Sequence, residues 1–168
     1  YGNGTMVTES ITIINSAPLI SASTLSLASL LETDSLSCFP IGEYDQDGDT
    51  ISFTYEWLVN GSSASSNPTI DGSLFNRGDT VQCQITPSDG NANGIGATIS
   101  STILTVANSL PTYVAAELSP TTVYEADTMT CVGITPADAD GDSVSPIYAW
   151  DVNGITIAPT SNTLTGTY

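Results

Sequence analysis

The sequence predicts an all-β protein, and three observations carry that prediction. Apolar residues alternate with Ser and Thr, as in TISSTILTV at 98–106, which is the period-2 pattern of half-buried strands. The 14 Gly and 9 Pro residues, which favour turns, are spread along the whole chain and separate the apolar segments. No segment shows a convincing helical period. At 168 residues the chain can hold one large or two small domains.

A long internal repeat organises the chain. Shifted by 93 residues, segment 11–75 matches 104–168 without a gap, with 21 identities in 65 positions. The string DQDGDT (45–50) falls on DADGDS, and YEWLVNG (55–61) falls on YAWDVNG. A fixed period in which Trp, Cys and three Asp keep register predicts a tandem array of similar modules.

The repeat also predicts where the modules begin and end. Residues 1–14 match 94–107 and are expected to be the last strand of a preceding module. Residues 15–107 form a complete module, and 108–168 form the N-terminal two-thirds of a second one.

Within the complete module, turn signals separate seven expected strands. In strand 52–59, alternation places Phe53, Tyr55, Trp57 and Val59 on one face. The full set of expected strands is 19–27, 35–41, 52–59, a weak one within 62–68, 69–75, 80–86 and 97–107.

Cys38, Trp57 and Cys83 occur in the order seen in immunoglobulin domains. The chain therefore resembles tandem immunoglobulin-like repeats of large prokaryotic surface proteins, and it is also similar to PKD-like and cadherin-like modules. The resemblance implies Greek-key β-sandwiches, a Cys38–Cys83 disulfide between the two sheets and an extracellular or cell-surface setting. One departure is Val81, which stands where those domains carry a Tyr.

Cys131 leaves an odd number of cysteines. Its counterpart is Cys38, so its partner would lie in the part of the second module that matches 76–91. The favoured interpretation is a partner outside this sequence window, and a free reactive thiol is the alternative. Completion of the second module by a strand from a neighbouring subunit is a further alternative.

Composition excludes several function classes. Eighteen acidic residues face one basic residue, Arg77, giving a net charge of −17. Such a chain repels phosphate backbones and anionic membrane surfaces, and no apolar run reaches the length of a membrane span. With no His and no Lys, general-base and Schiff-base chemistry lack their usual groups, so no enzyme is predicted.

Two repeated carboxylate clusters suggest calcium. Asp45, Asp47 and Asp49 alternate around Gly48, and Asp138, Asp140 and Asp142 repeat the pattern. Hard oxygen ligands on a glycine turn suit Ca²⁺, but an EF-hand is rejected because Thr50 holds the position that needs Gly. Solvated acidic loops are the alternative interpretation.

In an immunoglobulin-like sandwich the first Asp loop, Asp89 and Asn15 would meet at one end. Stacked modules would then form a junctional calcium site, as cadherin modules do. At this site, four residues of the chain, from the turns and the connecting segment, would meet the second Asp loop. These four are Glu32, Asp34, Asp79 and Asn108.

Two sequons, at Asn3 and Asn60, are candidate N-glycosylation sites. The tripeptide Arg77-Gly78-Asp79 spells an integrin-binding motif, but a turn before a strand explains it.

The sequence therefore predicts a structural repeat segment of an extracellular fibre, stalk or surface filament, whose partners are neighbouring modules or identical subunits. The alternative is an adhesin module that binds a glycan or protein receptor. Tyr44, Tyr113 and Tyr124 would be its best candidates if they lie outside the core.

Overall fold

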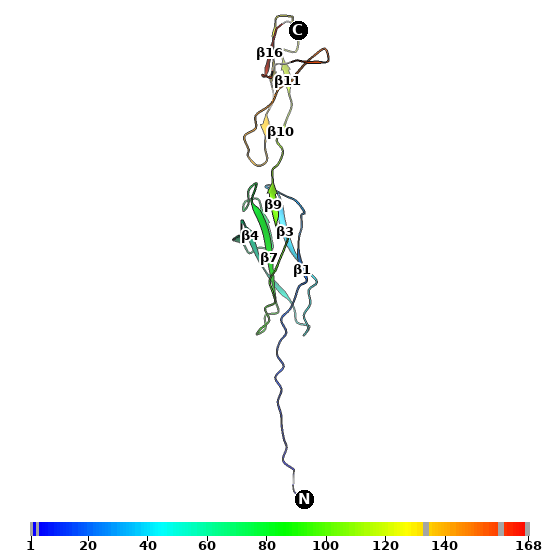
Figure 1. Cartoon of the computed structure of the whole chain (residues 1–168), viewed down its shortest axis with the longest axis vertical. Coiled ribbons are helices and arrows are strands. Elements are labelled where there is room, and N and C mark those ends of the chain that lie inside the picture. The colour runs from blue at the N-terminus through cyan, green and yellow to red at the C-terminus, as the bar shows by residue number, and fades with distance from the viewer. Residues whose placement is uncertain (1, 3, 133–134, 158–159, 167–168) are drawn as a thin grey trace. The chain divides into compact units, whose positions relative to one another are not determined.

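The computed structural model describes residue 2 and residues 4–132, 135–157 and 160–166. All regular structure in these ranges is β, as predicted, with no helix. The chain divides into two compact units (Figure 1). Unit 1 comprises residues 1–30 and 34–106, and unit 2 comprises residues 31–33 and 107–168.

Unit 1 is built from two sheets. One has the strand order β1-β3-β6, and the other has the order β2-β9-β7-β4-β5, with β8 pairing β7. The strands are β1 (Ala22–Leu25), β2 (Leu30–Leu31), β3 (Ser35–Ile41), β4 (Ser52–Val59), β5 (Ser62–Ser65), β6 (Thr69–Asp71), β7 (Thr80–Ser88), β8 (Ile99–Ser100) and β9 (Leu104–Ala107).

The core of unit 1 lies between these two sheets. Leu36 and Cys38 from β3 meet Trp57 from β4 and Val81 and Ile85 from β7, and all are buried. Cys38 is disulfide-bonded to Cys83, with Cα atoms 6.4 Å apart, so the bond crosses from one sheet to the other. This agrees with the predicted pairing and indicates an oxidising environment.

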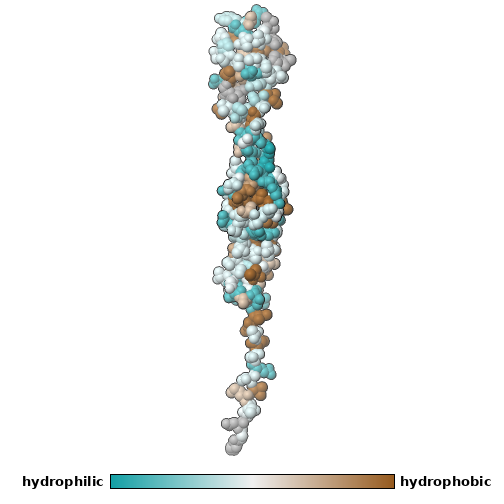
Figure 2. Space-filling view, turned by 90° about the vertical axis from the view of Figure 1, so that its left-hand side faces the viewer, coloured by the Kyte–Doolittle hydropathy of each residue, from teal (hydrophilic) through white to brown (hydrophobic). Residues whose placement is uncertain are grey.

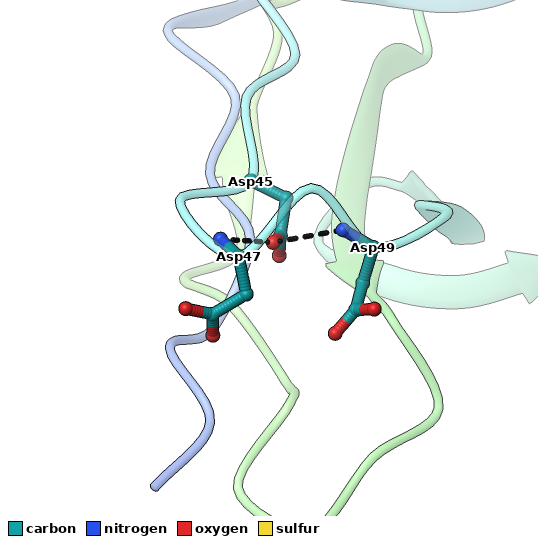
Figure 3. A group of neighbouring side chains, drawn as sticks. All are labelled: Asp45, Asp47 and Asp49. Carbon is teal, nitrogen blue, oxygen red and sulfur yellow. Dashed lines mark hydrogen bonds between the residues drawn. The ribbon is translucent and has the colours of Figure 1, made fainter. Parts of the chain in front are cut away.

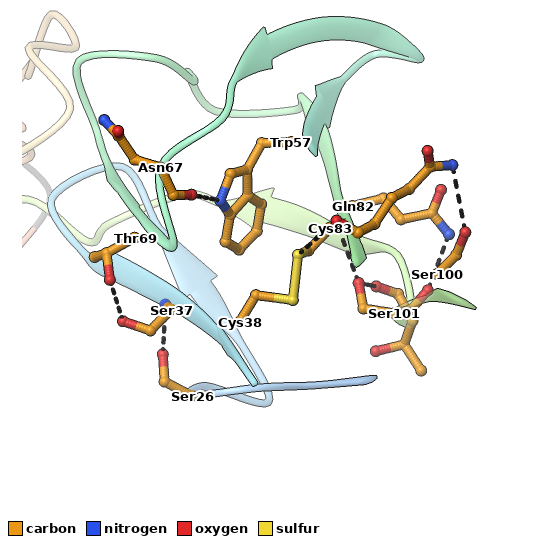
Figure 4. The surroundings of a disulfide bond; sticks show 12 residues. Ser26, Ser37, Cys38, Trp57, Asn67, Thr69, Gln82, Cys83, Ser100 and Ser101 are labelled. Carbon is orange, nitrogen blue, oxygen red and sulfur yellow. Dashed lines mark hydrogen bonds between the residues drawn. A yellow bond between two sulfur atoms is a disulfide. The ribbon is translucent and has the colours of Figure 1, made fainter. Parts of the chain in front are cut away.

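Trp57 packs beside this disulfide (Figure 4). It lies directly opposite Cys83 in the β4–β7 ladder. Its indole Nε1 donates a 2.8 Å hydrogen bond to the carbonyl oxygen of Asn67. A buried Trp keeps its polar atom satisfied in this way, so the ring fills the core without an unpaired donor.

Most strand predictions for unit 1 are confirmed. Segments 35–41 and 52–59 coincide with β3 and β4, and the side chains expected to face the core from β4 do so. The predicted strand 97–107 is instead split into β8 and β9. The backbone amide of Cys83 bonds the Ser101 hydroxyl at 3.0 Å, so a side chain replaces a backbone partner and interrupts the ladder.

The first segment of the chain forms no strand in this structure. Its described residues, 2 and 4–14, are extended and unpaired. Met6, Val7, Ile11, Ile13 and Ile14 are exposed, and Figure 2 shows apolar side chains spaced along this segment. The expectation that 1–14 is the last strand of a preceding module stays a prediction.

Unit 2 contains shorter sheets. The strands are β10 (Thr112–Tyr113), β11 (Glu117–Ser119), β12 (Thr128–Val132), β13 (Pro136–Ala137), β14 (Trp150–Val152), β15 (Ile155–Ile157) and β16 (Thr163–Thr165). They pair as β10-β13, β11-β12-β16 and β14-β15. The sheet β11-β12-β16 has the same antiparallel arrangement as β1-β3-β6.

The pairing registers correct one part of the predicted alignment. Ser35 pairs with Asp71, whereas Thr128, 93 residues after Ser35, pairs with Thr165, 94 residues after Asp71. The gap-free match is therefore wrong in its last part, where unit 2 holds one extra residue. The sequence carries the signal, since no identity follows Gly61 until TIDG (69–72) is set against TLTG (163–166).

Candidate metal sites

In the loop between β3 and β4, backbone amides point towards the carboxylate of Asp45. Asp45 Oδ1 accepts hydrogen bonds from the backbone amides of Asp47 at 2.8 Å and Asp49 at 3.2 Å. Gly48 makes this turn with φ of 79°, a conformation that side chains disfavour. The three carboxylates consequently face one region, and one oxygen from each lies within 4.8 Å of the others (Figure 3).

Two further segments reach this loop. The leading segment of unit 1, residues 15–18, contributes the backbone amide of Ser16, which bonds Asp47 Oδ2 at 2.6 Å. The loop after β7 contributes Asn91, whose amide nitrogen donates to Asp49 Oδ2 at 2.9 Å. The loop after β7 and the leading segment therefore both meet the first Asp triplet.

Asp89 joins the same group. Its Oδ2 accepts a 2.8 Å hydrogen bond from the side chain of Asn15, and its Oδ1 accepts one from the backbone amide of Asn91 at 2.7 Å. Gly94 leaves the space for this carboxylate, because a Cβ there would collide with it. The predicted meeting of Asp89, Asn15 and the first Asp loop is thus present in the structure.

The same arrangement recurs in unit 2. Asp138 Oδ1 accepts the backbone amides of Asp140 at 2.9 Å and Asp142 at 3.3 Å. Ser109, 93 residues after Ser16, donates its backbone amide to Asp140 Oδ2 at 2.5 Å. One oxygen each from Asp138, Asp140 and Asp142 lies within 4.8 Å of the others. Each unit therefore has an Asp loop tied to its own leading segment, 15–18 or 108–111.

The residues present fit a hard cation. Asp45 Oδ2 is buried without a hydrogen-bond partner among the described residues. Carboxylates so close repel one another unless a positive charge lies between them. Carboxylate and amide oxygens are the ligands that Ca²⁺ takes, and Asp45, Asp47, Asp49 and Asp89 supply the carboxylates on unit 1.

The other predicted ligands lie elsewhere in the chain. Asp34 precedes β3 and Asp79 precedes β7, both in unit 1, whereas Glu32 lies in the short stretch 31–33 that belongs to unit 2. Asp79 accepts hydrogen bonds from the side chain of Asn60 and the backbone amide of Asn76, and these bonds lower the pKa of its carboxyl. That Glu32, Asp34, Asp79 and Asn108 form a junction with the second Asp loop stays a prediction.

The two sequons differ in what can be said of them. Asn3 lies outside the described residues. Asn60 is exposed in the turn after β4 with φ of 51°, and its side chain bonds both Asp79 and the backbone amide of Thr80. A glycan on Asn60 would have to retain these contacts, and its presence stays a prediction.

Asn91 and Ser16 were missed as parts of the site by sequence reasoning. Asn91 has no counterpart in segment 108–168, so the repeat gives no signal for it. Ser16 acts through its backbone amide, which any residue supplies. The one signal that pointed to its segment was the recurrence of NSAP as NSLP.

Comparison with known proteins gives no assignment, since no protein-family model, curated protein or solved structure matches the sequence. Among the described residues, no helix is long and apolar enough to cross a membrane.

Proposed function

We propose that this chain is a structural repeat segment of an extracellular fibre, stalk or surface filament. Its modules are immunoglobulin-like Greek-key sandwiches repeated about every 93 residues. Calcium bound at the Asp loops stiffens the connections, and neighbouring modules or identical subunits are the partners. The disulfide supports the extracellular setting, because such bonds persist in oxidising compartments.

One observation carries the proposal, namely the bond between an Asp loop and the segment that leads into the same unit. Ser16 is bound to Asp47 in unit 1, and Ser109 is bound to Asp140 in unit 2. A segment that connects modules is flexible by default, and each immobilised residue loses conformational entropy. A cation on Asp45 and Asp47 would add a further constraint on the loop that holds this segment.

The recurrence favours a mechanical role over a chemical one. A ligand site for a receptor needs to occur once, whereas a joint has to occur at every connection. Both Asp loops keep their spacing, their glycine turn and their bond to the leading segment. Stiffening at every connection is the property that a long spacer requires.

Calcium titration into the metal-free chain tests the proposal. We expect two ions per chain by calorimetry, one lost in Asp45→Asn and the other in Asp138→Asn. At calcium concentrations about 100 times Kd, the stability of each unit should rise by about 2.7 kcal/mol. In head-to-tail concatemers of the chain, chelation should shorten the mean end-to-end distance measured by small-angle scattering.

The matched control is Glu56→Gln, which removes one negative charge from an exposed position of β4 that belongs to neither Asp loop. It should leave the stoichiometry at two. Calcium stiffening is refuted if chelation changes neither the thermal stability nor the length of the concatemers.

The adhesin alternative has less support. Tyr44, Tyr113 and Tyr124 are indeed exposed, at 57%, 49% and 80%. Tyr113 and Tyr124 line two different grooves and do not form one aromatic surface.

A further inference from the structure

Both ends of unit 1 are bonded to residues that lie between its two cysteines. At the N-terminal end, Leu19 exchanges two backbone hydrogen bonds with Tyr44, at 2.9 Å and 3.0 Å. At the C-terminal end, the carbonyl oxygen of Val106 accepts the amide of Gly78 at 2.9 Å, and the amide of Val106 donates to the carbonyl oxygen of Asp79 at 2.8 Å. The two ends of the unit are thus bonded to one internal stretch of the chain.

This internal stretch, residues 39–82, is a closed segment, because the Cys38–Cys83 bond joins its two ends. It contains the whole of β4, β5 and β6. The leading segment 15–18 is bonded to it through Asp47, and the loop after β7 is bonded to it through Asp49. β9 pairs with the first residues of β7, which also belong to it. The closed segment is therefore the part of unit 1 to which the flanking parts are attached.

The sulfur–sulfur bond is shielded in the folded unit. Cys38 and Cys83 are both buried, and Trp57 packs beside them (Figure 4). Because exchange requires a thiolate to reach a sulfur atom, a reductant has no access until the unit opens. The hydrogen bonds at the two ends are far weaker than a covalent bond, so a pull on the chain breaks them first.

We propose that unit 1 is a tension-bearing module in which the closed segment is exempt from extension. Once the hydrogen bonds at the ends break, tension runs along the chain to Cys38, across the disulfide to Cys83, and onward to Ala107. Residues 39–82 lie off this path, so opening the unit extends only the stretches before Cys38 and after Cys83. This inference rests on the proposed function, since a segment of a fibre or stalk is pulled from both sides.

The arrangement also protects the first Asp loop. Residues 45–49 lie wholly within the closed segment, so tension does not stretch the turn or the bonds from its backbone amides to Asp45. The leading segment 15–18 and Asp89 lie outside the closed segment and are pulled away from the loop. When tension falls, they return to a loop that was never extended.

Single-molecule pulling of the whole chain tests the proposal. The chain carries a covalent peptide tag at each terminus and is stretched without reductant in a calcium-free buffer. Replacing both Cys38 and Cys83 by Ala should lengthen the fully stretched chain by about 150 Å, because the 45 positions between them then extend as well. Cys131→Ser is the control and should leave the length unchanged. Equal lengths of the parent chain and the double variant would overturn the proposal.

A pair of insertions makes the same test with the disulfide in place. A flexible Gly-Ser insert of about ten residues after Ser66, in the exposed turn between β5 and β6, should leave the stretched length unchanged. The same insert after Ala28, in the exposed turn between β1 and β2, should add about 35 Å. Equal lengthening by both inserts would show that the closed segment carries tension and would overturn the proposal.

The bonds at the ends of the unit are tested by the lifetime of the folded unit under constant force. Leu19→Pro removes the amide that donates to Tyr44, and it should shorten this lifetime about fivefold. Leu19→Ala keeps the amide and changes only a half-exposed side chain, so it should leave the lifetime nearly unchanged. Equal effects of the two substitutions would refute the attachment at Tyr44.

These results can be told apart from a failure of the calcium proposal. The stretched lengths depend on covalent connectivity and should be the same with and without calcium. If chelation leaves the concatemers unchanged while the two inserts differ as expected, calcium stiffening fails and the closed segment stands. If the inserts behave alike while chelation shortens the concatemers, the closed segment fails and the proposed function stands.

Discussion

Units 1 and 2 contain closely similar sequences, and they differ most where a neighbouring strand is present in one and not in the other. The first five residues of YEWLVNG (55–59) lie in the eight-residue strand β4 of unit 1, whereas only the Trp150–Val152 part of YAWDVNG is a strand in unit 2. Propensity explains part of the difference, because Pro146 stands at the position of Phe53 and cannot donate a ladder hydrogen bond. A strand extends as far as its partner does, because its backbone groups require ladder bonds.

The features that remain the same in both units are those that need no distant partner. The Asp loops, the Asn-Gly turns at 60–61 and 153–154, and the Trp indole bond to a nearby carbonyl all recur. Segments held by short-range hydrogen bonds therefore adopt the same conformation in both units, whereas the burial of core side chains depends on the second sheet.

The largest expected effect concerns the disulfide, which is present in unit 1 alone. Replacing both Cys38 and Cys83 by Ala should lower the free energy of unfolding of unit 1 by about 4 kcal/mol, because the bond closes a 45-residue loop. Denaturant unfolding followed by Trp57 fluorescence in a Trp150→Phe chain measures it. Cys131→Ser is the control and should leave this transition in place. A loss under about 1 kcal/mol would mean that packing alone holds the two sheets.

The next effect compares one repeat position in two surroundings. Leu36→Ala should cost unit 1 about 3 kcal/mol, within the range for a fully buried side chain. Met129→Ala, at the same position of unit 2, should cost about 1 kcal/mol, because its side chain is already partly in water.

Each substitution is followed by the Trp of its own unit, with the other Trp changed to Phe. Equal losses at the two positions would show that unit 2 has a closed core, contrary to the comparison.

How far the sequence could predict the fold depends on the range of the interactions involved. β3 and β4 were predicted to the residue because their alternation and the flanking turns are local signals. β2 was missed since two residues leave no period to detect. The break between β8 and β9 depends on the hydrogen bond between Ser101 and Cys83. These residues are 18 positions apart in the sequence, so no local pattern predicts the bond.

The site shows the same division. The Asp triplets were visible because their spacing is regular, and their meeting with Asp89 and Asn15 followed from the expected fold. The role of Asn91 was not predictable, because Asn is common in loops. Only the folded structure shows that its side-chain amide bonds Asp49.

A smaller effect is expected at the Asn-Gly turns. Asn60 and Asn153 both have φ near 50°, so Ala at either position should cost about 1 kcal/mol of backbone strain. Asn60→Ala should cost about 1 kcal/mol more, because it also loses the bonds to Asp79 and Thr80. Thermal unfolding of the two single variants measures the difference. Asn60→Gly separates the two contributions, because it loses the same hydrogen bonds without the backbone strain.

The smallest expected effect is a pH dependence of the stability of unit 1. The bond from Asn60 lowers the pKa of Asp79 in the folded state, and the bonds from Ser73 lower the pKa of Asp71. A lowered folded pKa adds stability above the unfolded pKa, and this stability is lost as the pH falls through the folded value. The transition of Trp57 should therefore weaken below about pH 4. Asp79→Asn should flatten part of this slope, whereas Asp151→Asn in unit 2 should leave it unchanged. An unaltered slope in Asp79→Asn would show that its hydrogen bonds do not discriminate between the two protonation states.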